Sequence, residues 1–180
     1  MTYVAVMRTF LLAVALAATA SAWSQPASAA AAGSTETPAP GDIPDTQAFV
    51  TFAGPGYSVL VPEGWARTKR GSTVTFRSNA NSEAIEIGRP GTNRDLRARF
   101  HPAGAVRLKT HAALGTEPAS VFTFRSRSEP DPVTGKRIEL ENELYVSTHR
   151  GLSAMLLLSA PLGADNADQW KKIAQSFRWR

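Results

Sequence analysis

Short segments in which apolar and polar residues alternate restrict most strongly what this chain can fold into. Two pairs of them, 49–52 with 57–61 and 72–76 with 83–87, flank turn residues and predict β-hairpins. Further strands are predicted at 106–112, 121–127 and 137–146, and the fully apolar segment 154–158 predicts a covered central strand. The pattern therefore predicts a mostly antiparallel sheet of six to seven strands.

The last part of the chain has a helical period instead. Its apolar stripe falls at positions i, i+3, i+4 and i+7 and consists of Trp170, Ile173, Ala174 and Phe177. We predict a helix over 165–177, capped by Asp165 or Asn166, that packs on one face of the sheet. A short helix is predicted over 93–100, and the region of residues 90–104 is expected to cover part of the other face. The predicted fold class is therefore α+β.

Residues 1–29 have the composition of a secretory signal peptide. Arg8 precedes an apolar run from Phe10 to about Ala18, and Ala-x-Ala patterns follow it. Met7 would give a more usual start than Met1. Because the run is shorter than the roughly 20 residues that span a bilayer, we expect cleavage and an extracytoplasmic, secreted product. Membrane tethering by an uncleaved N-terminus is the less favoured alternative.

Residues 30–47 are rich in Ala, Pro, Ser, Thr and Gly, so we predict a flexible linker there and a folded domain over 48–180. The sequence contains no cysteine. No disulfide bond therefore stabilises the domain, and its core depends on packing alone. Thiol catalysis and cysteine-ligated metal sites are excluded.

The chain has 20 basic and 15 acidic side chains, a net charge of +5, and loss of Arg8 leaves 19 against 15. Arg67, Lys69 and Arg70 form a basic cluster after Trp65 and are the candidate surface-binding residues. Outside the cell membrane, an anionic partner would be a wall polymer, a lipid head group or an acidic protein, and nucleic acid is not expected. The alternative is a solvated basic face.

The stretch SEPDPVTGKR contains Thr-Gly-Lys, which also occurs in phosphate-binding P-loops. Here Pro130 replaces the first glycine of that motif, Arg137 replaces its Ser/Thr, and a strand follows instead of a helix. We therefore predict a hairpin tip in which Gly135 supplies a positive φ. The best apolar register of this hairpin places Arg125 opposite Glu139.

Four stretches occur in the order GYSVLVPEGW, PDPVTGK, PLGADNADQW and SFRW. Together they resemble actinobacterial exported proteins related to the PsbP family, including LpqN-type lipoproteins. The resemblance runs from about residue 48 to the end of the chain. It implies an α-β-α sandwich and a role as an accessory or binding protein. The absence of a lipobox cysteine departs from the lipoprotein members.

The aromatic residues in these stretches have a sufficient structural explanation. Tyr57, Pro62 and Trp65 are predicted to close the first hairpin onto the core, and Trp170 and Phe177 to dock the last helix. Truncation of a buried Trp or Phe to Ala typically costs about 3–5 kcal/mol, which accounts for such residues without a ligand.

No catalytic, cofactor-binding or metal-binding residue is predicted, and the three histidines lack metal-site spacing. Glu139, Glu141 and Glu143 share one strand face at a spacing of about 6.5–7 Å, which suits an acid–base pair. We expect a solvated stripe instead. A solvent-filled cleft that brings Trp65 or Trp170 beside paired acids would contradict the expectation that the aromatic side chains are used in packing the last helix against the sheet.

Three functions remain open. The preferred one is a secreted, monomeric, non-enzymatic accessory or binding domain of the cell envelope, whose partner is a protein, a wall polymer or a lipid. The second is an extracytoplasmic, carboxylate-based hydrolase, which a deep pocket joining two acids with shifted pKa values would favour. The third is a membrane-associated protein held by its uncleaved N-terminus or by the basic cluster of Arg67, Lys69 and Arg70.

Overall fold

The computed structural model describes residues 40–89, 91 and 93–180, with backbone only at 93 and 94. The chain divides into two units, Met1–Thr35 and Glu36–Arg180, and the described residues all belong to the second. The predicted signal peptide and all but the end of the predicted linker lie outside the described residues.

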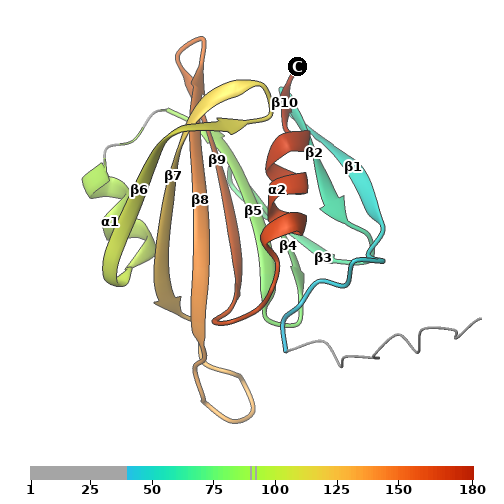
Figure 1. The fold of residues 1–180 in the computed structure, drawn as a ribbon, viewed down its shortest axis with the longest axis vertical. Coiled ribbons are helices and arrows are strands. Elements are labelled where there is room, and N and C mark those ends of the chain that lie inside the picture. Colours follow the sequence, from blue (N-terminus) through green and yellow to red (C-terminus); the bar gives the residue numbers. More distant parts are fainter. Residues whose placement is uncertain (1–39, 90, 92) are drawn as a thin grey trace, which may run out of the picture. The chain divides into compact units, whose positions relative to one another are not determined.

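Seven strands form the larger of two sheets, in the order β3-β4-β5-β9-β8-β7-β6, and every neighbouring pair is antiparallel (Figure 1). The strands are β3 (Ala66–Arg70), β4 (Thr73–Ser78), β5 (Asn81–Gly88), β6 (Ala103–Leu114), β7 (Glu117–Arg127), β8 (Glu139–His149) and β9 (Leu152–Pro161). The mostly antiparallel sheet that the alternation predicts is confirmed.

A smaller sheet has the order β1-β2-β10, with bounds β1 (Phe49–Gly54), β2 (Tyr57–Pro62) and β10 (Arg178–Trp179). β1 and β2 form the first predicted hairpin, and alternate residues at the start of β2 are buried. The sequence does not predict β10, because two residues are too few to show a period. Its pairing with β2 depends on where the preceding helix ends.

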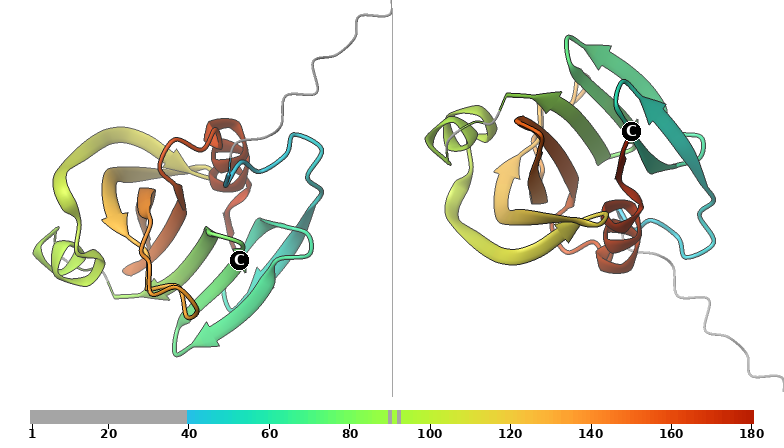
Figure 2. Two further views of the ribbon diagram at one scale, coloured as in Figure 1. Left: turned by 90° about the horizontal axis from the view of Figure 1, so that it is seen from below. Right: turned by 90° about the horizontal axis from the view of Figure 1, so that it is seen from above.

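Two helices lie on opposite sides of the larger sheet (Figure 2). The C-terminal helix α2 (Ala167–Ser176) packs against β2 and the end of β6, on the side that faces the smaller sheet. The helix α1 (Asn93–Phe100) lies on the other side. The predicted α-β-α arrangement is thereby confirmed. Among the described residues, neither helix is long and apolar enough to cross a membrane.

The core lies where the two sheets and α2 meet. The Tyr57 ring stacks on Phe177, with centroids 5.9 Å apart and planes inclined by 13°. Pro62 and Trp170 are also buried, and the half-buried Trp65 packs against the same cluster. The residues that the sequence assigns to the core thus lie in it or against it.

The packed domain begins before residue 48. Ile43 is only 4% exposed, and its backbone N–H donates to Asn166 Oδ1 at 2.6 Å. The backbone N–H of Asp165 donates to Asp42 Oδ1 at 2.8 Å. Asn166 does occupy the N-cap position of α2, but its side chain makes no capping hydrogen bond. Residues 41–45, which the composition placed in the linker, therefore contact the start of α2.

The stretch SEPDPVTGKR forms the tip between β7 and β8, which projects past the end of the sheet (Figure 1). One Asp131 carboxylate oxygen accepts from the backbone N–H groups two and three residues later, and Gly135 has a φ of 67°. Arg125 pairs with Glu141 and not with the predicted partner Glu139. The predicted register was wrong by two residues because the prediction made the tip two residues too short. A shift of two keeps every side chain on its face.

Candidate functional site

A groove of about 640 Å³ opens on the face of the larger sheet that carries α2. We call it the polar groove. One side of the groove is the segment that leads into α2. The other side is the part of the sheet formed by the start of β6, the end of β7 and the start of β8. Its charged and polar lining includes Arg107, Thr123, Arg125, Glu141, Glu143 and Asp165.

The strand registers explain why these side chains meet. Arg107 pairs with Thr123, which pairs with Glu143, and Arg125 pairs with Glu141. Directly paired residues of neighbouring strands point to the same face of a sheet, so the two rows form one charged surface. This surface lies on the side of the larger sheet that also holds the core.

The groove stays open because α2 is short. The helix has ten residues and is about 15 Å long, whereas the eleven residues of β8 extend about 37 Å. α2 reaches the end of β6 near Leu114, which is fully buried. It leaves the other end of the strands uncovered. The side chains there are polar, as expected where water and not a helix covers the sheet.

The two glutamates of the groove are electrostatically coupled. Burial raises the pKa of the Glu141 carboxyl, Arg125 opposite it acts to lower this pKa, and the neighbouring Glu143 acts to raise it. Glu143 Oε2 accepts a hydrogen bond from the Tyr145 hydroxyl at 2.8 Å. Burial, and then Glu143, raises the pKa of Tyr145 in turn. One carboxyl of the pair thus holds its proton more strongly than an ordinary glutamate.

Several groups of the polar groove make no hydrogen bond and no close ion pair with any other part of the chain that the structure describes. Among the described residues, no hydrogen bond or ion pair joins the side chains of Arg107, Arg125 or Glu141 to another group. Both guanidinium groups are exposed, and Glu141 is half-buried. Water satisfies these groups in the free protein, so a ligand that replaces the water finds donors and acceptors already in place.

Trp170 lines the same groove with Glu141 and Glu143. Its ring is only 7% exposed, so it forms part of the floor rather than an open stacking platform. An aromatic residue therefore lies beside paired acids in a solvent-filled hollow. Its ring is nonetheless used in packing α2 onto the core, and Glu139 does not line the groove.

The predicted basic cluster lies elsewhere. Arg67, Lys69 and Arg70 belong to β3, the edge strand of the larger sheet, which is exposed throughout and which the sequence does not predict. Alternation along the strand points Arg67 and Lys69 to one face and Arg70 to the other. The Arg67 guanidinium lies 5.8 Å from the centre of the Phe52 ring. The cluster is thus divided between two faces, and surface binding by it remains a prediction.

In residues 40–89, 91 and 93–180, no three histidine, aspartate or glutamate side chains group as metal ligands would. The polar groove carries two arginines beside its acids, and a guanidinium group near a carboxylate opposes cation binding. The arrangement suits recognition of a polar molecule by hydrogen bonds and charge.

No protein-family model matches the sequence, and no curated protein matches it either. Several solved structures are similar to the chain, and two of them illustrate the likeness. The solution structure of cyanobacterial PsbP (CyanoP) from Synechocystis sp. PCC 6803 is 20% identical, with 78% of this chain and 98% of that chain covered and a TM-score of 0.46. A crystal structure from Bacteroides thetaiotaomicron VPI-5482 is 14% identical, with a TM-score of 0.47.

The Bacteroides match covers 72% of this chain but only 48% of that one, so the chain spans about half the length of that structure. The match to CyanoP is with a PsbP protein, the group that the sequence motifs resemble. At these identities and TM-scores, neither likeness carries an argument about function. The LpqN-type subfamily remains a prediction.

Proposed function

We propose that this protein is a non-enzymatic accessory domain of the cell envelope and that the polar groove binds its ligand. The observation that carries this proposal is a set of charged groups in the groove that make no hydrogen bond or close ion pair with any described residue: the guanidinium groups of Arg107 and Arg125 and the carboxyl of Glu141. A matching ligand has an anionic group for the arginines and hydrogen-bond donors for the glutamates. Such a ligand is polar and of mixed charge.

The charged lining of the groove favours a wall polymer or a protein over a lipid as the partner. A wall-polymer fragment or a protein segment offers anionic groups and donors together, whereas an acyl chain would strip water from charged groups without replacing its hydrogen bonds. The signal-peptide pattern of residues 1–29 supports an extracytoplasmic location. Release, tethering and the monomeric state remain proposals. Liposome flotation with and without these residues tests the tethering.

Neutralising Arg125 is expected to weaken ligand binding. A hydrogen bond to a charged group contributes about 1.5–3 kcal/mol, so Arg125→Gln should lower the affinity for soluble cell-wall fragments by roughly tenfold or more. Isothermal titration calorimetry measures this. Arg77→Gln, an exposed arginine on the opposite face of the sheet, is the matched control and should bind as the unaltered protein does. Equal affinities for both variants would contradict the placement of the site.

A hydrolase is the second candidate, favoured by the raised pKa of Glu141 beside Glu143 in the groove. In that function, Glu141 acts as the general acid and Glu143 as the base. Glu141→Gln should then abolish turnover of wall-derived glycan and ester substrates while fragments still bind. If the unaltered protein binds fragments without releasing any product, the binding function is retained and the hydrolase is rejected.

A further inference from the structure

A second hollow lies on the opposite face of the larger sheet, under α1. We call it the α1 pocket. Its volume is about 150 Å³, and its lining is mostly aliphatic and aromatic. The main contributors from α1 and from strands β6, β7 and β8 are Leu96, Phe100, Val106, Phe122, Phe124 and Leu144.

The short helix explains why the space is not filled. α1 has eight residues, and Leu96 and Phe100, one turn apart, are the apolar side chains that it directs at the pocket. The Phe100 ring lies 6.1 Å from the Phe124 ring. The pairing of β6 with β7 shifts register twice, so the outermost strand does not follow its neighbour regularly. Leu108 on β6 stays 50% exposed at the edge of the pocket.

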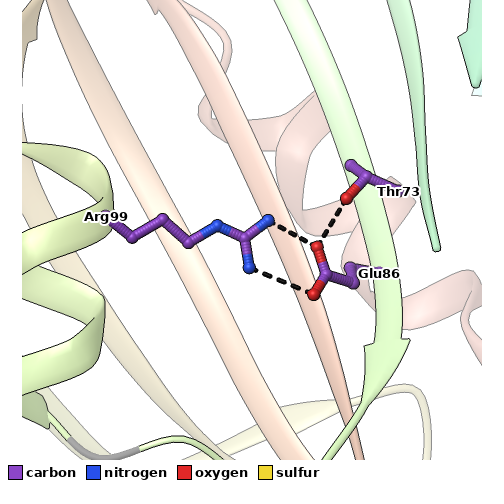
Figure 3. Close-up of polar contacts among 3 residues, drawn as sticks. All are labelled: Thr73, Glu86 and Arg99. Atoms are coloured by element: carbon purple, nitrogen blue, oxygen red, sulfur yellow. Dashed lines mark hydrogen bonds and ion pairs between the residues drawn. The ribbon is translucent and has the colours of Figure 1, made fainter. Parts of the chain in front are cut away.

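An ion pair holds α1 over the sheet. Both terminal guanidinium nitrogens of Arg99, Nη1 and Nη2, donate to the carboxylate of Glu86 on β5, and the Thr73 hydroxyl donates to the same carboxylate (Figure 3). The hydrogen bonds from Arg99, above all, hold the pKa of the Glu86 carboxyl below its usual range. The polar contact to β5 and the ring contact of Phe100 with Phe124 on β7 therefore place the helix beside the pocket.

The size of the pocket sets the size of its ligand. An apolar cavity of about 150 Å³ in another protein stays dry and takes up benzene, so a hollow of this volume accommodates roughly six apolar heavy atoms. Arg97 is the one charged residue among the described residues that line the α1 pocket. Its exposed side chain makes no ion pair with any described residue. A ligand with an apolar end and an anionic head meets both features.

We propose that the α1 pocket binds a small amphipathic monocarboxylate, such as a six-carbon fatty acid or an aromatic acid. The apolar end lies between Phe100, Phe122 and Leu144, and the carboxylate lies at the Arg97 guanidinium. This site lies on the opposite face of the sheet from the polar groove, although Phe124 lines both hollows. It differs in chemistry as well, because apolar burial supplies most of its affinity and one charge sets its orientation.

Titration of the full-length chain with hexanoate, followed by amide chemical shifts, tests the proposal first. Shifts should concentrate on α1 and the facing residues of β6–β8. Benzoate should compete with hexanoate for the same site. No saturable shift with either acid, or shifts confined to the polar groove, would overturn the proposal. This measurement uses the unaltered protein and does not depend on how a variant folds.

Variants then separate the two parts of the site. Leu108→Trp obstructs the pocket edge and should weaken hexanoate binding at least tenfold, whereas Leu152→Trp, at a residue of similar exposure on β9, should change it less than twofold. Arg97→Gln should weaken hexanoate binding about fivefold and leave binding of hexan-1-ol unchanged. Arg125→Gln in the polar groove should leave hexanoate binding unchanged. Equal effects of the two tryptophan variants, or an unaltered hexanoate affinity in Arg97→Gln, would refute the site.

Discussion

Replacing Glu83 by leucine is expected to stabilise the protein at neutral pH and to remove most of its loss of stability as the pH rises. Glu83 lies on β5 with 0% of its surface exposed. Neither oxygen of its carboxyl has a hydrogen-bond partner among the described residues, and the nearby Tyr57 hydroxyl has none either. Burial raises the pKa of Glu83 well above its ordinary value, and burial together with Glu83 raises the pKa of Tyr57 to about 12.

The sign of the effect follows from the raised pKa of Glu83. The folded state binds the proton more tightly than the unfolded state, so stability is highest below the unfolded pKa. It falls as the pH rises through the window between the unfolded and the folded pKa, by about 1.4 kcal/mol per pH unit. Leucine has no proton to lose and no polar atom to bury, so this slope should disappear.

Urea unfolding of the two proteins at several pH values from 4 to 8 measures the difference. The free energies of unfolding should diverge as the pH rises, with the leucine variant more stable. Glu139→Leu, at an exposed position of β8, is the control and should run parallel to the unaltered protein. Parallel curves for Glu83→Leu would show that its carboxyl is not buried in solution.

Replacing Gly115 by alanine is expected to cost about 4 kcal/mol or more, at the upper end of single substitutions. Gly115 lies in the turn between β6 and β7 with a φ of +62°, and an added Cβ would lie 1.9 Å from the backbone oxygen of Phe177. Its N–H donates to the carbonyl oxygen of Ala174 at 2.8 Å, near the end of α2. The obstacle is backbone, so relief of the clash requires the end of α2 and β10 to move.

Gly71 provides a matched control for this substitution. Its φ is +58°, close to that of Gly115, but nothing lies within 4 Å of an added Cβ. Gly71→Ala should therefore lose only the roughly 1–2 kcal/mol of the left-handed conformation itself. Thermal and urea unfolding of both variants isolate the contribution of the contact with α2. A Gly115→Ala protein no less stable than Gly71→Ala would contradict this contact.

Local patterns predicted the parts of the fold that depend on neighbouring residues. The short helix was expected at 93–100 and occupies those residues, and the hairpins of β1–β2 and β4–β5 follow their alternation and turns. The parity of β7 and β8 places Arg125 opposite a glutamate even though the register differs by two. This shared face of Arg125 and the glutamates is the sequence signal from which a pairing of Arg125 with Glu141 could have been predicted.

Other parts had no local signal. Ile43 is an isolated apolar residue in a linker-like composition, and its burial depends on Asn166, which lies 123 residues away. β3 carries no alternating apolar face, because both of its faces are exposed. The polar groove depends on the strand order that brings Arg107 beside Thr123 and Glu143. This order cannot be inferred from any one segment of the sequence.

The sequence alone determined both helices, every strand except β3 and β10, and which side of the predicted strands is apolar, because backbone sterics and side-chain alternation act over a few residues. Tertiary structure alone decided where those faces stay uncovered. A ten-residue helix leaves the polar groove open on one face, and an eight-residue helix leaves the α1 pocket on the other. The physical reason is length: a helix rises less than half as far per residue as the strand beneath it, so it cannot cover the whole sheet.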